Sequence, residues 1–346
     1  MIQRPGPAIC VWELTLLCNA ACVHCGSSAG KARARELTTD EALALCDDLA
    51  SLGTKNVTLS GGEPLLRPDW DRIAQRLTDQ GIRVDLISNG LGWDSEKARR
   101  AREAGIEAVS LSIDGPLPVH DALRGMAGAF SRAMQSVRCL QAEGMPVGAV
   151  TQVSRWNAGV LAAIEEVLVR AGFMGWQLQL TMNLGRCAEL ADLPLTPGEI
   201  PSVARFVTEA SERGRIPVYA GDNLGWMTRS EARLRSARRP CNRVFLGCQA
   251  GLQVLGITSD GTLRGCLSMP SAMNEQSVRT RSLRDVWNDD TAFAYNRCFD
   301  ESALQGACAS CAFRRVCRGG CKSMAWSTTG GVVSNPSCLR LNEGDP

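Results

Sequence analysis

Histidine is scarce in this chain of 346 residues, which contains only His24 and His120. Histidine is the main ligand of catalytic zinc and the base of Ser–His–Asp catalysis, so neither chemistry is favoured here. An excess of charge of one sign is also missing, because 38 Lys and Arg nearly balance 36 Asp and Glu, for a formal net charge of +2. This balance provides no field that favours nucleic acid or a membrane as a partner.

Long apolar runs are absent as well. The first residues, Met1-Ile-Gln-Arg-Pro-Gly-Pro, lack the apolar core of a signal peptide, and no later stretch approaches the length of a membrane span. We therefore expect a cytoplasmic protein. Cysteine, in contrast, is abundant, with 16 residues. In a cytoplasmic chain this number indicates metal ligands rather than disulfides.

Three of the cysteines form the sequence Cys18-x3-Cys22-x2-Cys25, directly after the apolar run 9–17. The run predicts a strand over 10–17, which places the cysteines on the loop at its carboxyl end. In a β/α barrel the active site lies at that end. Three thiolates on one loop can hold three irons of a [4Fe–4S] cluster and leave the fourth iron open. A zinc loop is the alternative.

Short apolar runs alternate with longer helical periods as far as about residue 182. We predict strands over 10–17, 56–60, 82–88, 107–113, 146–153 and 176–182. We predict helices over 39–52, 69–80, 94–104, 127–143, 159–171 and 197–213, the first capped by Thr38 or Thr39. Six strands separated by helices indicate parallel pairing. Periodicity alone leaves a partial barrel and a doubly wound sheet as alternatives.

Polar residues follow several of these strands. The second strand leads into Gly61-Gly62-Glu63-Pro64, where the two glycines let the backbone approach a ligand closely. The third and fourth strands end in the short polar side chains Ser88, Asn89, Ser112 and Asp114. Ordinary turn chemistry is the alternative explanation at these positions. Gln152, and Gln177 or Gln179, are further candidates to line the mouth of the barrel.

Together these motifs resemble those of the radical SAM enzymes, and the resemblance implies a partial (β/α)6 barrel. In that family one electron from the cluster cleaves S-adenosylmethionine, and the 5′-deoxyadenosyl radical then takes a hydrogen from the substrate. The resemblance makes Cys18, Cys22 and Cys25 the catalytic cluster ligands. It assigns the methionine end of the cofactor to Gly61, Gly62, Glu63 and Pro64, and further cofactor contacts to Ser88, Asn89, Ser112 and Asp114. In the segment His120-Asp-Ala-Leu-Arg124-Gly, Arg124 would pair with the cofactor carboxylate, and His120 would be structural.

Cysteines are concentrated again after residue 240. The pattern is Cys241-x6-Cys248, then Gly261-x4-Cys266, then Cys308-x2-Cys311-x5-Cys317-x3-Cys321, and finally Cys338. Between Cys248 and Cys266 we predict a β-hairpin whose turn is Ser259-Asp260-Gly261. A helix is predicted from Ser282 to about Arg297. Zinc ligation is the alternative to iron–sulfur clusters here.

This C-terminal array resembles the SPASM domain of radical SAM peptide maturases. The resemblance implies that Cys241, Cys248, Cys266 and Cys321 hold one auxiliary cluster and that Cys308, Cys311, Cys317 and Cys338 hold a second. With the radical cluster, three [4Fe–4S] clusters and S-adenosylmethionine are the expected cofactors. The other cysteines are predicted to be buried or free thiols: Cys10, Cys46, Cys139, Cys187 and Cys298. We expect a radical SAM core over 1–215, a bridging region over 216–240 and a SPASM domain over 241–346.

The resemblance also implies a function. Most enzymes of this type modify ribosomal peptides, so we expect hydrogen abstraction from a peptide and an oxidative side-chain crosslink of the C–C, C–O or thioether kind. Peptide epimerisation, cofactor biosynthesis, another small-molecule reaction and a non-catalytic electron-transfer or partner-binding protein remain alternatives. Sulfatase maturation is disfavoured, because Leu267 stands where those enzymes carry an Asp.

The same reasoning gives expectations about partners. Only seventeen residues precede Cys18, too few for an N-terminal peptide-recognition domain, so leader binding, if the reaction needs it, would fall to a separate leader-recognition protein or to the C-terminal cysteine-rich cap. A flavodoxin- or ferredoxin-type protein is the expected electron donor. Six arginines between 228 and 243 could dock an acidic partner, although a solvated helix face is the simpler reading.

Overall fold

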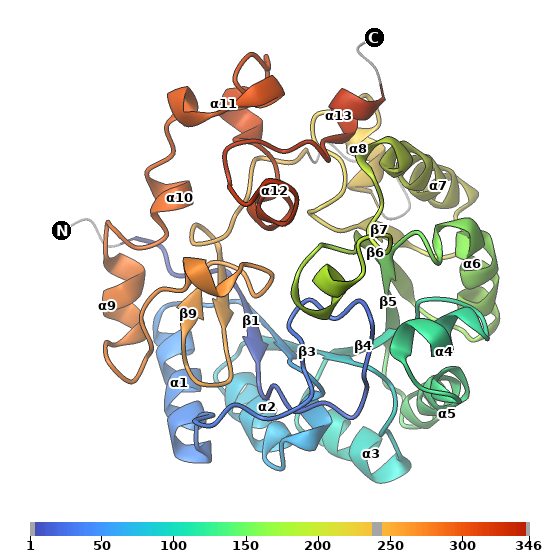
Figure 1. The fold of residues 1–346 in the computed structure, drawn as a ribbon. Helices are drawn as coiled ribbons and strands as arrows, with labels where there is room; N and C mark the ends of the chain where they lie inside the picture. The colour runs from blue at the N-terminus through green and yellow to red at the C-terminus, as the bar shows by residue number, and fades with distance from the viewer. Residues whose placement is uncertain (1–3, 237–243, 344–346) are drawn as a thin grey trace.

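Nine strands form a single sheet in the computed structural model, which describes residues 4–236 and 244–343 (Figure 1). The strands are β1 (Ile9–Glu13), β2 (Asn56–Ser60), β3 (Arg83–Ser88), β4 (Ala108–Ser112), β5 (Val147–Val153), β6 (Gly175–Leu180), β7 (Val218–Ala220), β8 (Val254–Ile257) and β9 (Leu263–Arg264). Their order in the sheet is β7-β6-β5-β4-β3-β2-β1-β8-β9. Every neighbouring pair is parallel except β8 and β9, which are antiparallel. The predicted partial barrel is confirmed.

Helices follow most of the strands along the chain and surround the sheet, and the C-terminal region adds several more (Figure 1). They are α1 (Thr39–Ser51), α2 (Trp70–Asp79), α3 (Ser95–Glu103), α4 (Val119–Arg124), α5 (Ala129–Ala142), α6 (Leu161–Arg170), α7 (Ile200–Arg213), α8 (Glu231–Leu234), α9 (Leu283–Asn288), α10 (Ala294–Arg297), α11 (Arg314–Cys317), α12 (Lys322–Thr329) and α13 (Leu339–Asn342). The 3₁₀ helices are η1 (Pro64–Leu66), η2 (Ala158–Val160), η3 (Gly185–Glu189), η4 (Pro197–Glu199), η5 (Ser271–Met273), η6 (Glu301–Ala303) and η7 (Gly306–Cys308).

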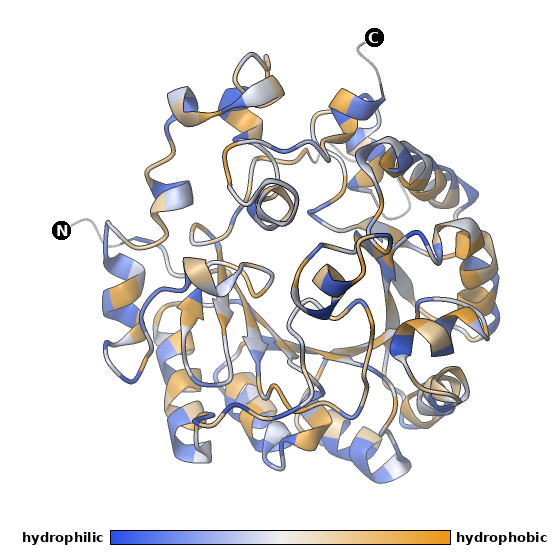
Figure 2. Ribbon diagram, in the orientation of Figure 1, coloured by the Kyte–Doolittle hydropathy of each residue, from blue (hydrophilic) through white to orange (hydrophobic). Residues whose placement is uncertain are grey.

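The predicted helices of the barrel are present, and their ends follow ordinary capping rules. Thr38 caps α1 through a capping box, in which its hydroxyl accepts the Glu41 N–H and the Glu41 carboxylate accepts the Thr38 N–H. Asp94 caps α3 by accepting the Lys97 N–H at 2.8 Å. Figure 2 shows that these helices alternate hydrophobic and hydrophilic residues, as expected of helices that cover a sheet.

Alternation along the strands separates the core from the interior of the barrel. On β2, Val57 and Leu59 are fully buried against the helices, whereas Ser60 faces the interior and lines a cavity there. On β4, Val109 and Leu111 are buried in the same way and Ser112 faces inward. Polar side chains at the carboxyl ends of the strands therefore gather at one mouth.

The predicted strand 10–17 is too long, because β1 ends at Glu13. Beyond Glu13, two backbone N–H groups donate to side chains instead of to a neighbouring strand. Leu16 N–H donates to Glu36 Oε1 at 2.8 Å, and Leu17 N–H donates to Thr15 Oγ1 at 3.0 Å. Groups bonded in this way are not free for a strand ladder. The chain leaves the sheet here and begins the loop that carries the first three cysteines.

The C-terminal region continues the barrel sheet. The predicted hairpin is present as β8 and β9, but β8 also pairs in parallel with β1, which the sequence did not predict. The sheet likewise extends at its other edge into β7, inside the predicted bridging region. The predicted helix 282–297 is divided into α9 and α10, because Phe293 has a left-handed φ of 54° and its N–H donates to Glu275.

Within the described residues, no helix combines the length and the apolar character that crossing a bilayer requires.

Candidate active site

Two glycines hold the turn after β2 against the chain that leads into the cysteine loop. Gly62 N–H donates to the Thr15 carbonyl at 2.8 Å, and Glu63 N–H donates to the Leu17 carbonyl at 2.9 Å. A Cβ added to Gly61 would lie 2.4 Å from the Thr15 oxygen, and one added to Gly62 would lie 2.3 Å from the Leu17 oxygen. Only glycine permits this approach.

The sulfur atoms of the cysteine loop each accept a nitrogen donor. The pairs are Ala20 N to Cys18 Sγ at 3.4 Å, Arg124 Nη1 to Cys22 Sγ at 3.5 Å and Ala29 N to Cys25 Sγ at 3.4 Å. The Ala20 N–H favours the thiolate of Cys18, which is the form that ligates metal, although burial is the larger effect and raises the pKa of this thiol. Three sulfurs on one loop with this supply of donors fit the ligand set of an iron–sulfur cluster.

Glu63 joins β2 to β3 behind the loop. Its fully buried carboxylate accepts the Ser88 hydroxyl at 2.9 Å and the Asn89 N–H at 2.8 Å. Burial outweighs these bonds and raises the pKa of Glu63 to about 7. The Asn89 amide donates to Asn19 Oδ1 at 2.8 Å and, more weakly, to Cys18 Sγ at 3.7 Å. Glu63 therefore positions Asn89 beside the first cysteine.

Both histidines of the chain lie near one buried carboxylate. Asp114 Oδ2 is 2.5 Å from Arg124 Nη2 and 3.3 Å from His24 Nε2, and the Asp114 N–H donates to His120 Nδ1 at 3.1 Å. Burial lowers the pKa of each histidine to about 4, so both are neutral at pH 7. His120 is fully buried with its ring against Phe130, as expected of a structural residue. The Arg124 guanidinium is held between Asp114 and Cys22, and its pairing with a cofactor carboxylate stays a prediction.

A cavity of about 240 Å³ lies at the cysteine loop. It is lined by most of the residues that the sequence singled out: Cys18, Cys22, Cys25, Gly61, Gly62, Ser88, Asn89, Ser112, Arg124, Gln152 and Gln179. Glu63, Pro64 and Asp114 are buried behind this lining. The sequence motifs thus meet at one place, although their contacts with a cofactor stay predictions.

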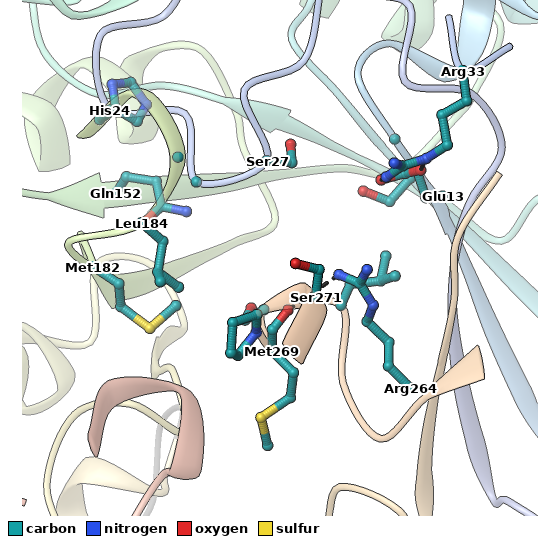
Figure 3. Close-up of a pocket in the computed structure, with 17 residues that line it drawn as sticks. Glu13, His24, Ser27, Arg33, Gln152, Met182, Leu184, Arg264, Met269 and Ser271 are labelled. Carbon is teal, nitrogen blue, oxygen red and sulfur yellow. Dashed lines mark hydrogen bonds and ion pairs between the residues drawn. The ribbon is translucent and has the colours of Figure 1, made fainter. Parts of the chain in front are cut away.

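A larger cavity of about 520 Å³ adjoins the first, and both share His24, Ser27, Ser60, Gly61 and Gln152. Figure 3 shows Arg264, Arg33 and Glu13 on one side of this cavity, and Met182, Leu184, His24 and Gln152 on the other. Arg264 Nη1 donates to the Met269 carbonyl at 3.1 Å, while its Nε is buried and donates to no described atom. The larger cavity therefore combines some apolar side chains, such as Met182 and Leu184, with an incompletely satisfied cation.

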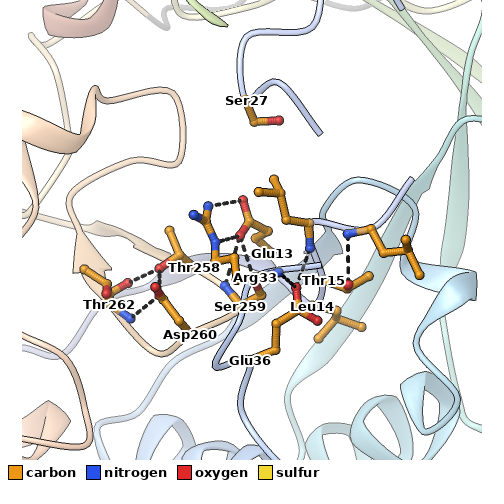
Figure 4. Close-up of polar contacts among 12 residues, drawn as sticks. Glu13, Leu14, Thr15, Ser27, Arg33, Glu36, Thr258, Ser259, Asp260 and Thr262 are labelled. Atoms are coloured by element: carbon orange, nitrogen blue, oxygen red, sulfur yellow. Dashed lines mark hydrogen bonds and ion pairs between the residues drawn. The ribbon is translucent and has the colours of Figure 1, made fainter. Parts of the chain in front are cut away.

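The second arginine of the larger cavity is already paired. Arg33 Nε and Nη2 donate to the two oxygens of Glu13 at 2.9 and 3.2 Å (Figure 4). Glu13 also accepts the N–H and the hydroxyl of Ser259, at 3.1 and 3.0 Å, from the turn between β8 and β9. This network ties the barrel, the cysteine loop and the C-terminal hairpin together at the cavity wall.

The C-terminal cysteines form two groups. Burial and the neighbouring thiols Cys248 and Cys266 raise the pKa of Cys321. Because Cys321 lies close enough to feel both thiols, these three cysteines form the first group. Cys241, predicted to join them, lies outside the described residues. The second group lines a small cavity of about 30 Å³ and consists of Cys308, Cys311, Cys317 and Cys338.

Of the eight cysteines predicted to hold the auxiliary clusters, the seven that the structure describes lie three in the first group and four in the second. Ligation itself stays a prediction. In residues 4–236 and 244–343, no three His, Cys, Asp or Glu side chains are arranged to hold a single metal ion.

The sequence missed three residues of the site. Arg264 and Glu13 belong to strands at one end of the sheet. Which face of the sheet their side chains occupy could not be predicted, because the pairing of these strands was unknown. Arg186 lies in a segment that was predicted to be a loop leaving the barrel. The adjacent residues Gly185 and Arg186 were the one feature of this segment that could have indicated a contact with the cysteine loop. A glycine followed by an arginine is too common in proteins to be specific.

Known proteins share this arrangement. The sequence model of the Radical SAM superfamily matches residues 12–154, and that of an iron-sulfur cluster-binding domain, SPASM, matches residues 248–312. The chain is 31% identical to the AdoMet-dependent heme synthase of Methanosarcina barkeri, with 96% of this chain and 97% of that protein covered. This chain belongs to the radical SAM superfamily. The two domains of this radical SAM enzyme imply S-adenosylmethionine and [4Fe–4S] clusters as cofactors.

Two further proteins are similar to this radical SAM enzyme. The mycofactocin maturase MftC of Mycobacterium tuberculosis is 30% identical, over 93% of this chain and 80% of that one. The structure of Streptococcus suis SuiB bound to the precursor peptide SuiA matches with a TM-score of 0.74 at 14% identity, over 96% of this chain and 76% of SuiB. At that identity the likeness to SuiB concerns the fold alone.

Proposed function

We propose that this radical SAM enzyme cleaves S-adenosylmethionine in the smaller cavity and takes a hydrogen atom from a carboxylate-bearing tetrapyrrole in the larger one. The observation that carries the substrate proposal is Arg264. Its guanidinium lines a cavity that adjoins the cysteine loop, and its buried Nε donates to no described atom. A substrate carboxylate in that cavity would bind the Arg264 guanidinium in a charge-assisted hydrogen bond.

The cysteine loop would hold the cluster through Cys18, Cys22 and Cys25. Once bound, the cluster would supply the electron that cleaves the sulfonium of S-adenosylmethionine to the 5′-deoxyadenosyl radical. Gly61 and Gly62 would bring backbone groups to the methionine end of the cofactor. The other lining residues would bind its ribose and carboxylate: Ser88, Asn89, Ser112 and Arg124. The buried residues Glu63, Pro64 and Asp114 would fix that lining from behind.

Two auxiliary clusters would complete a set of three. Cys241, Cys248, Cys266 and Cys321 would ligate one, and Cys308, Cys311, Cys317 and Cys338 the other. Seven of these eight cysteines already lie in two separate groups. The electron released when the substrate radical is converted to a closed-shell product would pass to these clusters. We propose a flavodoxin- or ferredoxin-type protein as the donor of the first electron.

The lining of the larger cavity supports a tetrapyrrole. Met182, Leu184, Leu267, Met269 and Pro270 provide apolar contacts for a flat ring, while Arg264 provides the cation for a carboxylate at its rim. The relative that carries the name heme synthase is covered along almost its whole length. Both observations favour a tetrapyrrole with carboxylate side chains over an uncharged substrate.

Peptide crosslinking is the second candidate. It is supported by the similarity to a mycofactocin maturase along 93% of this chain. In this case the larger cavity would receive a peptide side chain, a separate leader-recognition protein would present the peptide, and a C–C, C–O or thioether bond would form. An oxidative crosslink would leave the peptide two hydrogens lighter, whereas an epimerised product would keep its mass.

Binding of an iron porphyrin that carries propionates tests the first candidate. Titration of the anaerobically purified enzyme, followed by absorption, should give saturable binding. Arg264→Gln should weaken this binding by roughly tenfold or more, because a hydrogen bond to a charged group is lost. Arg35→Gln removes an exposed arginine outside the cavity and should leave binding unchanged. The porphyrin methyl ester should bind the wild type and Arg264→Gln equally.

Turnover decides between the two candidates. With S-adenosylmethionine and a reductant, the porphyrin should increase the yield of 5′-deoxyadenosine and should itself change in mass. If the porphyrin neither binds nor stimulates 5′-deoxyadenosine formation, the tetrapyrrole proposal is wrong. A short peptide encoded next to this gene that does both would establish the second candidate.

A further inference from the structure

The segment after β6 contacts both cavities. Met182, Leu184 and Gly185 line the larger cavity, and Arg186 lines the smaller one. In Figure 3 Met182 and Leu184 lie on the same side of the larger cavity as His24, which belongs to the cysteine loop. This segment is therefore positioned to act on the loop that carries the cluster ligands.

Arg186 bonds to the cysteine loop at three carbonyl groups. Its N–H donates to the Cys25 carbonyl at 3.0 Å, its Nε to the Cys22 carbonyl at 2.9 Å and its Nη1 to the Ala29 carbonyl at 2.6 Å. The first two carbonyls belong to the proposed cluster ligands Cys25 and Cys22, and the third, of Ala29, lies four residues after Cys25. One side chain thus spans the loop from its second cysteine to its end.

Other segments also hold the loop, since Val23 N–H donates to the Leu123 carbonyl and Gly30 N–H to the Leu16 carbonyl, both at 3.0 Å, but the turns within the loop are weakly bonded. Cys25 N–H donates to the Cys22 carbonyl at 3.3 Å and Ser28 N–H donates to the Cys25 carbonyl at 3.4 Å, and bonds of this length are weak. Ser28 also has a left-handed φ of 51°, which is unfavourable for a residue other than glycine, asparagine or aspartate. The side-chain bonds from Arg186, at 2.9 and 2.6 Å, are shorter and therefore reinforce the turns between Cys22 and Ala29.

Gly185 allows Arg186 to come this close. Its φ is +56°, and an added Cβ would lie 2.5 Å from the oxygens of both Cys25 and Gly26. A larger residue here would push the segment away from the loop and lengthen the bonds of Arg186. The Gly185-Arg186 pair works as a unit in which the glycine makes the approach and the arginine makes the contacts.

We infer that Arg186 is a positioning residue that holds the cysteine loop in the conformation that binds the cluster and places a positive charge beside it. A forked guanidinium can bond two carbonyls at once, which a lysine ammonium on a flexible stem does less well. A fixed cation also favours the more negative, reduced state of a nearby cluster. This inference rests on the radical SAM family and not on the substrate proposed above.

Two variants distinguish the effect of the paired guanidinium hydrogen bonds from the effect of the positive charge. Arg186→Gln removes both, whereas Arg186→Lys keeps the charge and loses the fork. Arg170→Gln is the matched control, because Arg170 is a largely exposed arginine on α6 that pairs with Glu166. All three are purified anaerobically with their clusters. The measurements are the rate of iron loss to a chelator and the midpoint potential of the radical cluster from EPR-monitored titration.

Arg186→Gln should lose iron from the radical cluster severalfold faster than wild type and should have a lower midpoint potential. Arg186→Lys should lose iron faster too, but should keep a potential close to that of wild type. Gly185→Ala, with Arg186 intact, should resemble Arg186→Lys. If Arg186→Gln fails to fold, Arg186→Lys and Gly185→Ala decide the question. Iron loss at the wild-type rate in the variants that fold would overturn the inference.

Discussion

Replacing Gly62 by alanine should separate the turn after β2 from the cysteine loop. The φ of Gly62 is accessible to alanine, so the penalty comes from contact alone. The new Cβ would lie 2.3 Å from the Leu17 oxygen, whereas ordinary contact begins at 3.4 Å, so the two backbones must part by about 1 Å. Flexible side chains cannot absorb this shift, because the nearest atoms are backbone carbonyls of Leu16 and Leu17.

A separation of this size breaks two hydrogen bonds. Gly62 N–H to Thr15 O, at 2.8 Å, and Glu63 N–H to Leu17 O, at 2.9 Å, would both lengthen beyond the range of a good bond. Each is worth about 1 kcal/mol net, and leaving a buried donor unpaired costs somewhat more. We therefore expect the cluster-free variant to lose about 2–3 kcal/mol of unfolding free energy.

Urea unfolding of the cluster-free protein, followed by tryptophan fluorescence, measures this loss. Gly198→Ala is the matched control, because a Cβ at Gly198 in η4 meets no atom within 4 Å. That variant should be as stable as wild type, or slightly more so, since alanine restricts the unfolded chain. Gly62→Ala should unfold at lower urea and retain less iron after reconstitution. Equal midpoints and equal iron in the two variants would refute the steric argument.

Three other changes give separate tests. Burial raises the pKa of Glu63 from 4.5 to about 7, so the folding stability of the wild type falls as pH rises between these values. Glu63→Gln has no carboxylate to ionise and should not show this loss. In the cluster-free proteins, the stability of the variant relative to wild type should therefore increase from pH 5 to pH 8. If the urea midpoints of Glu63→Gln and wild type differ by the same amount at every pH, this account of Glu63 is wrong. Arg264→Gln should weaken porphyrin binding while basal cleavage of S-adenosylmethionine continues, and equal loss of both would mean that Arg264 serves the fold instead. Cys241→Ala should lower the iron content of the purified protein, and unchanged iron would exclude Cys241 as a ligand.

The barrel strands were predictable because their pattern is local. β2 has the predicted bounds 56–60, and β3 to β6 differ from prediction by at most two residues at either end. Strands such as β2 and β4 alternate buried apolar residues with polar ones and lie between helices with clear periods, so each can be identified without its neighbours. The cluster motifs were predictable for the same reason, since the spacing of Cys18, Cys22 and Cys25 is contained in eight residues.

The missed features depend on contacts between distant segments. β7 has only three residues and is stabilised by pairing with β6. Leu16 and Leu17 leave the strand because their N–H groups are taken by Glu36 and Thr15, which no apolar pattern records. Arg186 meets a loop about 160 residues earlier in the chain. Such pairings are set by tertiary structure, so sequence periodicity could not predict them.

The parallel pairing of β8 with β1 explains why the C-terminal region lines the larger cavity. That pairing places the turn after β8 next to Glu13, which accepts both the N–H and the hydroxyl of Ser259. It also places β9 at the edge of the sheet, from which Arg264 reaches the larger cavity. The cavity wall is therefore built jointly by the barrel and by the hairpin that leads into Cys266. A change in the hairpin that leaves every cysteine in place should consequently alter substrate binding as well as cluster retention.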